Sequence, residues 1–137
     1  MNRLIYILVV LLPLAGFLYG CEKKPSKKPG SIYGVVTLQS NGEPVVGATV
    51  KLYRTGGSSD DGGYTYDHYM AGATTSIVGR YEFKDLLCEY KDYYWIKQYE
   101  YSIEVKARVA GISYTLSGEA STTVEPGKEC RVDIEVK

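Results

Sequence analysis

Few side chains in this sequence have the type and spacing that chemistry at a protein site needs. His68 is the only histidine, so neither a cluster of zinc ligands nor a histidine base with a nucleophilic partner is indicated. The stretch SSDDGGYTYD, residues 58–67, holds three acidic side chains, but their spacing and number do not match an EF-hand calcium loop. A solvated loop is the favoured interpretation. We therefore expect no catalytic residue, no metal, no cofactor and no enzymatic activity.

The tyrosines are the most unusual side chains, fourteen in number. The densest aromatic group is Tyr93, Tyr94 and Trp95, within EYKDYYWIKQYEY. Tyrosine and tryptophan offer a large amphipathic contact area, so exposed clusters of them bind proteins or sugar rings. Because the pattern between Cys88 and Tyr99 is not cleanly period two, it predicts a connecting loop or irregular edge with at least two exposed rings. The three aromatic residues are the candidate ligand-binding residues, and packing in the core is the alternative.

The N-terminal residues resemble a signal sequence that ends at a cysteine. Arg3 precedes an apolar run of about fifteen residues, which is the length of a signal-peptide core and shorter than the roughly twenty residues of a membrane-spanning helix. The segment LYGC, which ends at Cys21, resembles the lipobox of bacterial lipoproteins. The resemblance implies that residues 1–20 are a lipoprotein signal peptide and that the Cys21 sulfur carries a diacylglyceryl group. An ordinary signal peptide cut near Gly20 and an uncleaved membrane helix are the alternatives.

Residues 21–30 are expected to be the lipidated cysteine and a tether. The lysines and prolines after Cys21 supply little apolar surface, and the prolines favour an extended spacer. The lysines could lie against anionic headgroups, and a merely solvated linker is the alternative. The lipoprotein resemblance implies a protein of the bacterial cell envelope, lipid-anchored at the outer membrane. Its expected partners are the membrane and an unknown envelope protein or glycan.

The charges balance, with sixteen basic and sixteen acidic side chains. A balanced surface argues against a nucleic-acid partner, which would need a basic face. Cys88 and Cys130 are the cysteines that remain after the expected cleavage. An oxidising envelope compartment permits a disulfide between them, and two free thiols are an equal alternative.

The elements that would carry these side chains are strands. The stretch YEYSIEVKARVA alternates strictly between the two faces of a half-buried antiparallel strand, with these residues inward: Tyr101, Ile103, Val105, Ala107 and Val109. Similar alternation predicts strands in SIYGVVTL, ATVKLYR, GRYEF, ISYTLSG and CRVDIEVK, separated by glycine- and proline-containing turns. Residues 31–137 are therefore expected to form one all-β sandwich. Val50 and Val105 should be buried, one on each of its two sheets.

Two stretches, GSIYGVVTLQSNGEPVVGATVKLYR and TTSIVGRYEFKDL, resemble the carboxypeptidase regulatory-like domains. Residues 34–36, 44–50 and 79–83 occupy the places of that family's motifs. The resemblance implies a seven-stranded, prealbumin-like (transthyretin-like) β-sandwich with Greek-key connections. It also implies a non-enzymatic binding or scaffolding module, and a carbohydrate-binding accessory lipoprotein in glycan uptake is the alternative. Gly47 is expected where the chain bends into the next strand, and Gly79 in the turn before Tyr81.

Overall fold

The computed structural model describes residues 24–55, 67–92 and 95–137. These residues contain strands and no helix, which confirms the predicted all-β fold. There are ten strands among them, against the seven that the family resemblance implied. The strands are β1 Gly30–Leu38, β2 Thr49–Thr55, β3 Asp67–Thr74, β4 Arg80–Leu86, β5 Glu89–Asp92, β6 Trp95–Gln98, β7 Glu100–Ala107, β8 Leu116–Thr123, β9 Glu129–Arg131 and β10 Ile134–Val136.

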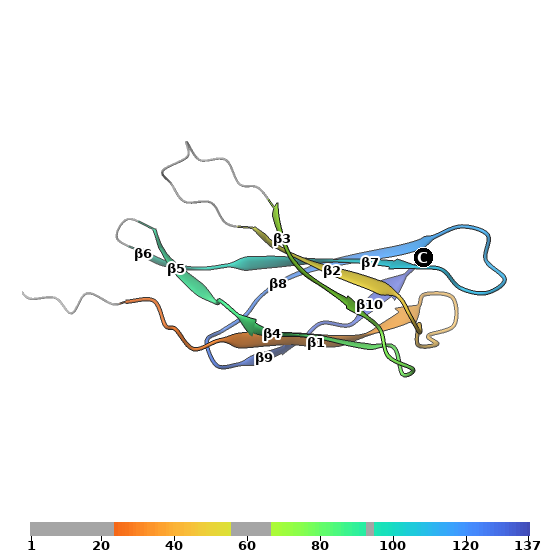
Figure 1. The fold of residues 1–137 in the computed structure, drawn as a ribbon, viewed down its shortest axis with the longest axis horizontal. Coiled ribbons are helices and arrows are strands. Elements are labelled where there is room, and N and C mark those ends of the chain that lie inside the picture. Colours follow the sequence, from red (N-terminus) through yellow and green to blue (C-terminus); the bar gives the residue numbers. More distant parts are fainter. Residues whose placement is uncertain (1–23, 56–66, 93–94) are drawn as a thin grey trace, which may run out of the picture.

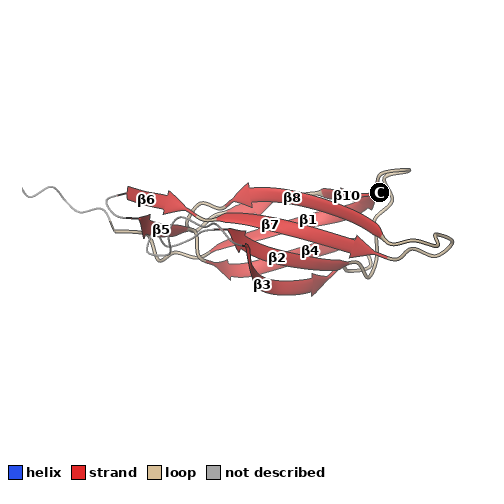
Figure 2. Ribbon diagram, turned by 90° about the horizontal axis from the view of Figure 1, so that it is seen from above, coloured by secondary structure: helices blue, strands red, loops and turns tan. Residues whose placement is uncertain are grey.

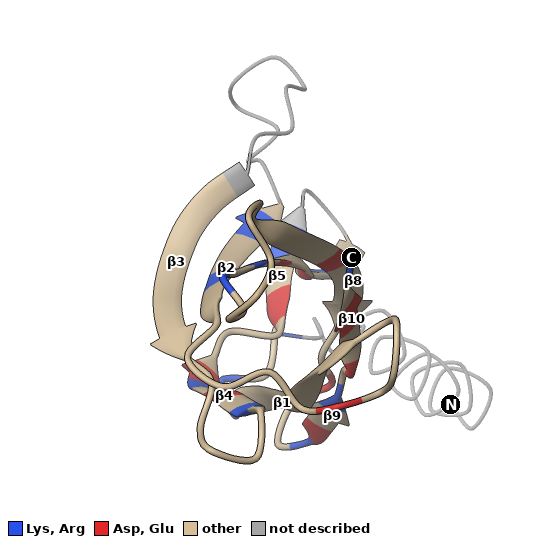
Figure 3. Ribbon diagram, turned by 90° about the vertical axis from the view of Figure 1, so that its right-hand side faces the viewer, with Lys and Arg blue, Asp and Glu red and all other residues tan. Residues whose placement is uncertain are grey.

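Two four-stranded sheets pack face to face in a sandwich (Figure 1). β1 is central in one sheet, where it pairs antiparallel with β4 and in parallel with β9 and β10. The other sheet has the order β3–β2–β7–β8 and is antiparallel throughout. Ser117 and Lys137 exchange two backbone hydrogen bonds of 3.1 Å, which closes the sandwich beside β8 and β10, opposite β3 (Figure 3). The β5–β6 hairpin extends beyond one end of the sandwich (Figure 2).

The core lies between the inward faces of the two sheets, as the alternation predicted. On β7 the side chains of Tyr101, Ile103, Val105 and Ala107 are all buried. The facing side chains of β1 and β4 are buried as well: Ile32, Val36, Tyr81 and Phe83. The period-two pattern therefore predicted both the strands and their inward faces correctly for β1, β2, β4 and β7.

Val50 and Val105 are both fully buried, but the expectation that they lie on different sheets is wrong. Val50 of β2 pairs directly with Val105 of β7 in one antiparallel sheet. Alternating apolar residues show which face of a strand points into the core. Strands of both sheets have such a face, so the pattern does not tell to which sheet a strand belongs.

Truncating Val50 or Val105 to alanine should lower the free energy of unfolding by about 1–3 kcal/mol, because each change removes buried methyl groups and leaves a cavity. Since the two side chains are cross-strand neighbours, the double variant should depart from additivity. Thr49→Ala, at the exposed neighbouring position, should change the free energy by less than about 0.5 kcal/mol. Urea denaturation measures all four variants, and equal sensitivity at Thr49 and Val50 would contradict the observed register.

The two motif glycines lie in the conformations expected of them. Gly47 has a φ of 72° and precedes β2, and Gly79 has a φ of 73° in the turn before β4. A side chain at Gly79 would also approach the backbone oxygen of Val36 to 2.8 Å. Glycine adopts a positive φ without steric cost, so these positions account for the glycines of the two motifs.

The prediction of a strand in ISYTLSG is wrong in its bounds. β8 begins at Leu116 and continues to Thr123, while Tyr114 lies in the preceding loop with 65% of its surface exposed.

β3 was not predicted, because its sequence DHYMAGAT shows no alternation of apolar and polar residues. It is an edge strand with a register shift opposite Leu52 and Tyr53, and Tyr69 and Met70 on it are both exposed. Edge strands and bulges leave such side chains without the regular in-and-out pattern.

The C-terminal stretch CRVDIEVK forms two short strands instead of one. Asp133 interrupts it, because its carboxylate accepts a 3.0 Å hydrogen bond from the Val35 backbone N–H where a main-chain acceptor would otherwise lie. The predicted faces are kept: Ile134 and Val136 are buried, and Cys130 and Val132 are half-buried.

Candidate binding surface

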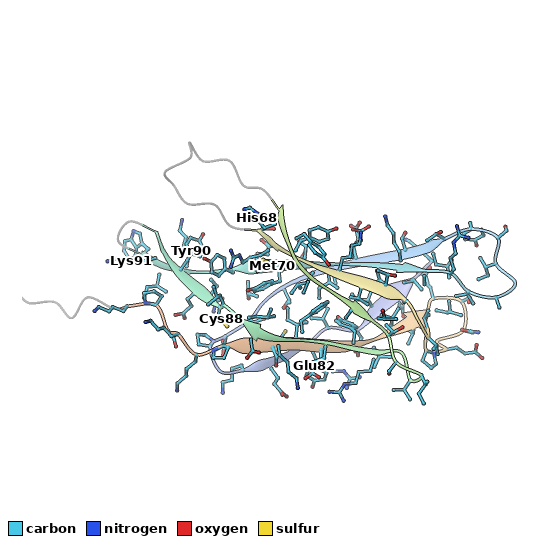
Figure 4. The ribbon with its side chains drawn as sticks, viewed as in Figure 1. His68, Met70, Glu82, Cys88, Tyr90 and Lys91 are labelled. Carbon is cyan, nitrogen blue, oxygen red and sulfur yellow. The ribbon has the colours of Figure 1, made fainter. Side chains whose placement is uncertain are left out.

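The hairpin formed by β5 and β6 carries the candidate ligand-binding residues. Of the three, Trp95 is placed, at the start of β6 with 72% of its surface exposed, and Tyr93 and Tyr94 lie outside the described residues. Figure 4 shows Tyr90 and Lys91 on β5, at the end of the molecule from which the hairpin projects. The prediction of an irregular loop after Cys88 is wrong, since β5 and β6 pair regularly, Tyr90 with Lys97 and Lys91 with Ile96.

One face of this hairpin is aromatic. Residues two apart on a strand share a face, so Trp95 lies on the same face as Lys97 and its partner Tyr90. The ring of Tyr90 packs on Tyr99, with ring centroids 4.7 Å apart. Tyr90 is therefore half-buried by its neighbour, while Trp95 faces solvent.

Beneath this face the stack continues into the sandwich. The Arg54 guanidinium lies over the Tyr99 ring at 4.4 Å, a cation–π contact. Arg54 Nε is buried and has no hydrogen-bond partner among the described residues. Burial raises the pKa of the neighbouring Tyr101 to about 12, although the positive charge of Arg54 opposes the shift. Tyr101 thus stays protonated and donates its hydroxyl hydrogen bond to the Leu87 carbonyl.

The base of the hairpin is fixed to the sandwich by backbone bonds as well. Tyr99 N–H donates a 2.9 Å hydrogen bond to the Cys88 carbonyl, just before β5 begins. Together with the stack of Tyr90, Tyr99 and Arg54, this bond holds the hairpin on a rigid support. Tyr99 belongs to the aromatic stretch that the sequence singled out, but Arg54 was not identified as part of this surface, since its contact with Tyr99 joins segments far apart in the chain.

Cys88 and Cys130 are free thiols in the structure, so the possible disulfide between them is not formed. Cys88 is buried, and its thiol donates to the Leu86 carbonyl at 3.4 Å. Burial raises the pKa of this thiol, which disfavours the reactive thiolate. Cys130 is half-buried, with its sulfur 3.2 Å from the Thr122 hydroxyl oxygen. The two sulfurs therefore have separate surroundings.

The remaining candidates for chemistry are not assembled into a site. His68 lies exposed on β3, opposite Arg54 of β2, and most of the acidic stretch 58–67 lies outside the described residues. The part of the chain that the structure describes contains no group of three or more His, Cys, Asp or Glu side chains able to hold a metal ion. Within 24–55, 67–92 and 95–137, no helix is long and apolar enough to cross a membrane.

A second group of exposed apolar side chains lies at the opposite end of the sandwich. We call Val46, Ile77 and Val78 the tip patch; all three are exposed, Ile77 by 84%. Their two loops are joined by a 3.1 Å hydrogen bond from Gly47 N–H to the Thr75 carbonyl. Connections between strands give no periodic signal, so the sequence pattern did not predict this patch.

A polar groove of about 780 Å³ runs along the closed side, between β1, β8 and β10. Its lining carries charges of both signs, and among them Arg131 Nε contacts the Asp133 carboxylate at 3.1 Å. Such a shallow groove of mixed charge offers no apolar anchor of the kind that Trp95 presents.

No protein-family model matches the sequence, and no curated protein matches it. Among solved structures, a double mutant of the shaft pilin SpaA from Lactobacillus rhamnosus GG is similar, with a TM-score of 0.50, 15% identity, and coverage of 81% of this chain and 51% of the pilin. The N-terminal domain of that pilin alone gives a TM-score of 0.49 and 15% identity over 82% of this chain and 95% of the domain. A 3-chlorocatechol 1,2-dioxygenase from Rhodococcus opacus 1CP gives 0.47 and 9%, over 83% and 61%.

At these identities the likeness is one of fold. The chain spans about half the length of the intact pilin, so the comparison concerns one domain of that protein. What the comparisons share with the structure is the all-β sandwich itself.

Proposed function

We propose that the protein is a non-enzymatic, lipid-anchored module of the bacterial cell envelope that binds or scaffolds a partner. The observation that carries the proposal is Trp95, a large aromatic side chain left exposed on a projecting, well-supported hairpin. Tryptophan is enriched at contact surfaces, because its large ring offers apolar area and its N–H a hydrogen-bond donor. The tip patch gives the module a second surface, as a scaffold requires.

The support beneath Trp95 favours binding over simple packing. Tyr90, Tyr99 and Arg54 are already stacked, so little conformational entropy would be lost when a partner covers the surface. The lipid anchor follows from the lipobox-like segment that ends at Cys21, outside the described residues. Together these features describe a domain held at a membrane with apolar surfaces to offer.

We also propose that the sandwich is a carboxypeptidase regulatory-like domain. The positive φ of Gly47 and Gly79 supports it, because both family motifs have a glycine where the backbone requires one. The buried Thr75 hydroxyl adds to this: it donates to the Val45 carbonyl at 2.6 Å and accepts from Ala48 N–H at 2.8 Å. These bonds hold the Pro–Val–Val–Gly–Ala segment against the end of β3.

A carbohydrate-binding accessory lipoprotein is the second candidate. It is favoured by the same Trp95 ring, because indole faces stack on sugar rings and the ring is open to solvent. In this case the ligand would be a glycan presented to an uptake system in the envelope.

Cross-linking pull-down from intact cells, with a glycan array in parallel, tests the proposal. The variants are Trp95→Ala and the double variant Ile77→Ser with Val78→Ser, and we expect at least one of them to lose most of the captured partner. Because these side chains are exposed, the melting temperatures should stay within about 2 °C of the parent. Tyr114→Ala, at an exposed aromatic ring in another loop, is the matched control and should change nothing. Capture that survives all of these changes would contradict the proposed surfaces, and glycan binding lost with Trp95 would favour the second candidate.

A further inference from the structure

The chain enters the sandwich at its hairpin end, and it is fixed there. Ser26 N–H donates a 2.9 Å hydrogen bond to the Glu89 carboxylate, at the first residue of β5. Gly127 N–H donates a 3.1 Å hydrogen bond to the Pro29 carbonyl, and β1 starts at Gly30. Figure 1 shows residues 24–29 entering at the same end of the sandwich as β5 and β6. The expected tether is therefore packed against the domain from Ser26 onward.

This attachment limits how far the domain can lie from an anchor at Cys21. Ser26 is the fifth residue after Cys21, and an extended chain advances at most about 3.6 Å per residue, so the span is at most about 18 Å. If Cys21 is acylated, as the proposed function holds, the hairpin end must lie close to the lipid headgroups. The tip patch is then at the end of the sandwich that points away from the membrane.

The side chains of the hairpin end suit a membrane–water interface. Trp95 and Leu87 are exposed apolar groups, and tryptophan is enriched at the level of the headgroups, where its ring is buried and its N–H is hydrated. Basic side chains surround them, and such residues attract anionic lipids. The exposed lysines on the tether and hairpin are Lys24, Lys27, Lys28, Lys91 and Lys97.

Acidic side chains at the same end offset part of this positive charge, and Asp85, Glu125 and Glu129 are exposed there, close to Gly30 and Ser31. The Glu89 carboxylate accepts the Ser26 hydrogen bond and is partly buried, while Glu100 is exposed at the start of β7. The tether and hairpin therefore carry five exposed lysines at the end of the domain from which the anchor comes. Lysine side chains also extend easily toward headgroups while the tryptophan ring goes deeper.

We infer that the partner of the hairpin surface is the bilayer interface: Trp95 inserts among the headgroups of an anionic membrane and sets the orientation of the anchored domain. The acyl chains of the anchor hold the protein at the membrane but leave its orientation free, so a second contact of this kind fixes the direction of the domain. The sandwich would then stand on its hairpin end and present the tip patch to an envelope partner. The inference rests on the proposed anchor but concerns a different group, the Trp95 side chain.

Because Trp95 is the only tryptophan, its fluorescence reports on this surface alone. The full mature protein, purified from membranes in detergent, is reconstituted into vesicles of phosphatidylcholine with 30% phosphatidylglycerol, with or without brominated phosphatidylcholine. The expected result is flotation with the vesicles and loss of about half or more of the Trp95 emission to the brominated lipid. Quenching should weaken when phosphatidylglycerol is omitted.

The matched control moves the probe to the far end of the sandwich, by combining Trp95→Phe with Tyr114→Trp. This protein should float equally well, and its emission should be insensitive to brominated lipid. A wild-type protein that floats but is quenched no more than this control would overturn the inference and leave the anchor intact. A protein that does not float would overturn the anchor, and the inference with it.

Discussion

Gly34→Ala is expected to lower the free energy of unfolding by about 3 kcal/mol or more, out of a total that is commonly 5–15 kcal/mol for a domain. A methyl group on Gly34 would lie 1.7 Å from the Val132 carbonyl oxygen and 2.6 Å from its carbonyl carbon. These are backbone atoms, fixed by the hydrogen bond from Val132 N–H to the Tyr33 carbonyl and by the Tyr81 hydroxyl that donates to the Val132 carbonyl. Relief would require β1 to separate from the C-terminal segment.

The matched control is Gly72→Ala, which also adds a methyl group to a glycine within a strand. There the nearest atom is the Tyr69 hydroxyl at 2.9 Å, the far end of a mobile side chain, so the cost should be about 1 kcal/mol or less. Urea denaturation compares the two variants. Equal, small losses would show that the C-terminal segment does not pass over Gly34 as the structure has it.

Cys21→Ser is expected to abolish lipid attachment altogether, because a serine hydroxyl cannot replace the acylated sulfur. Each methylene of an acyl chain contributes about 0.8 kcal/mol on entering the bilayer, so a protein with several chains stays bound while one without them does not. The variant should be found as the uncleaved precursor or as a form released from the membrane. Detergent partition of cell extracts, with the mass of each form, measures the effect.

Cys130→Ser is the matched control for this change. The Cys130 sulfur forms a hydrogen bond with the Thr122 hydroxyl. Replacing this sulfur should not affect acylation, so the variant should stay in the detergent phase. If the Cys21→Ser protein is still acylated and still partitions into the detergent phase, Cys21 is not the site of the anchor.

Several elements were predictable from the sequence because their burial is periodic. The inward faces of β1, β2, β4 and β7 follow from alternation, and the glycines at 47 and 79 follow from the turns that need a positive φ. Which sheet each strand joins did not follow, as Val50 and Val105 demonstrate. Sheet assignment depends on long-range pairing, which the alternation within one strand does not encode.

The candidate surface was predictable only in part. The exposed ring of Trp95 agrees with the prediction drawn from the density of aromatic residues in that stretch. The regular β5–β6 hairpin was not predicted, because the polar residues of both strands hide the alternation. The contacts of Arg54 with Tyr99, and of Ser26 with Glu89, join segments far apart in the chain. Such contacts arise from the fold, so no local pattern could indicate them.

The most direct test of the account is the mass of the N-terminal peptide of the mature protein, isolated from membranes of the native cell. We expect a peptide that begins at Cys21 and carries the added mass of a diacylglyceryl group on the sulfur. A peptide that begins at Cys21 with an unmodified thiol, or one that still contains residues 1–20, would contradict it.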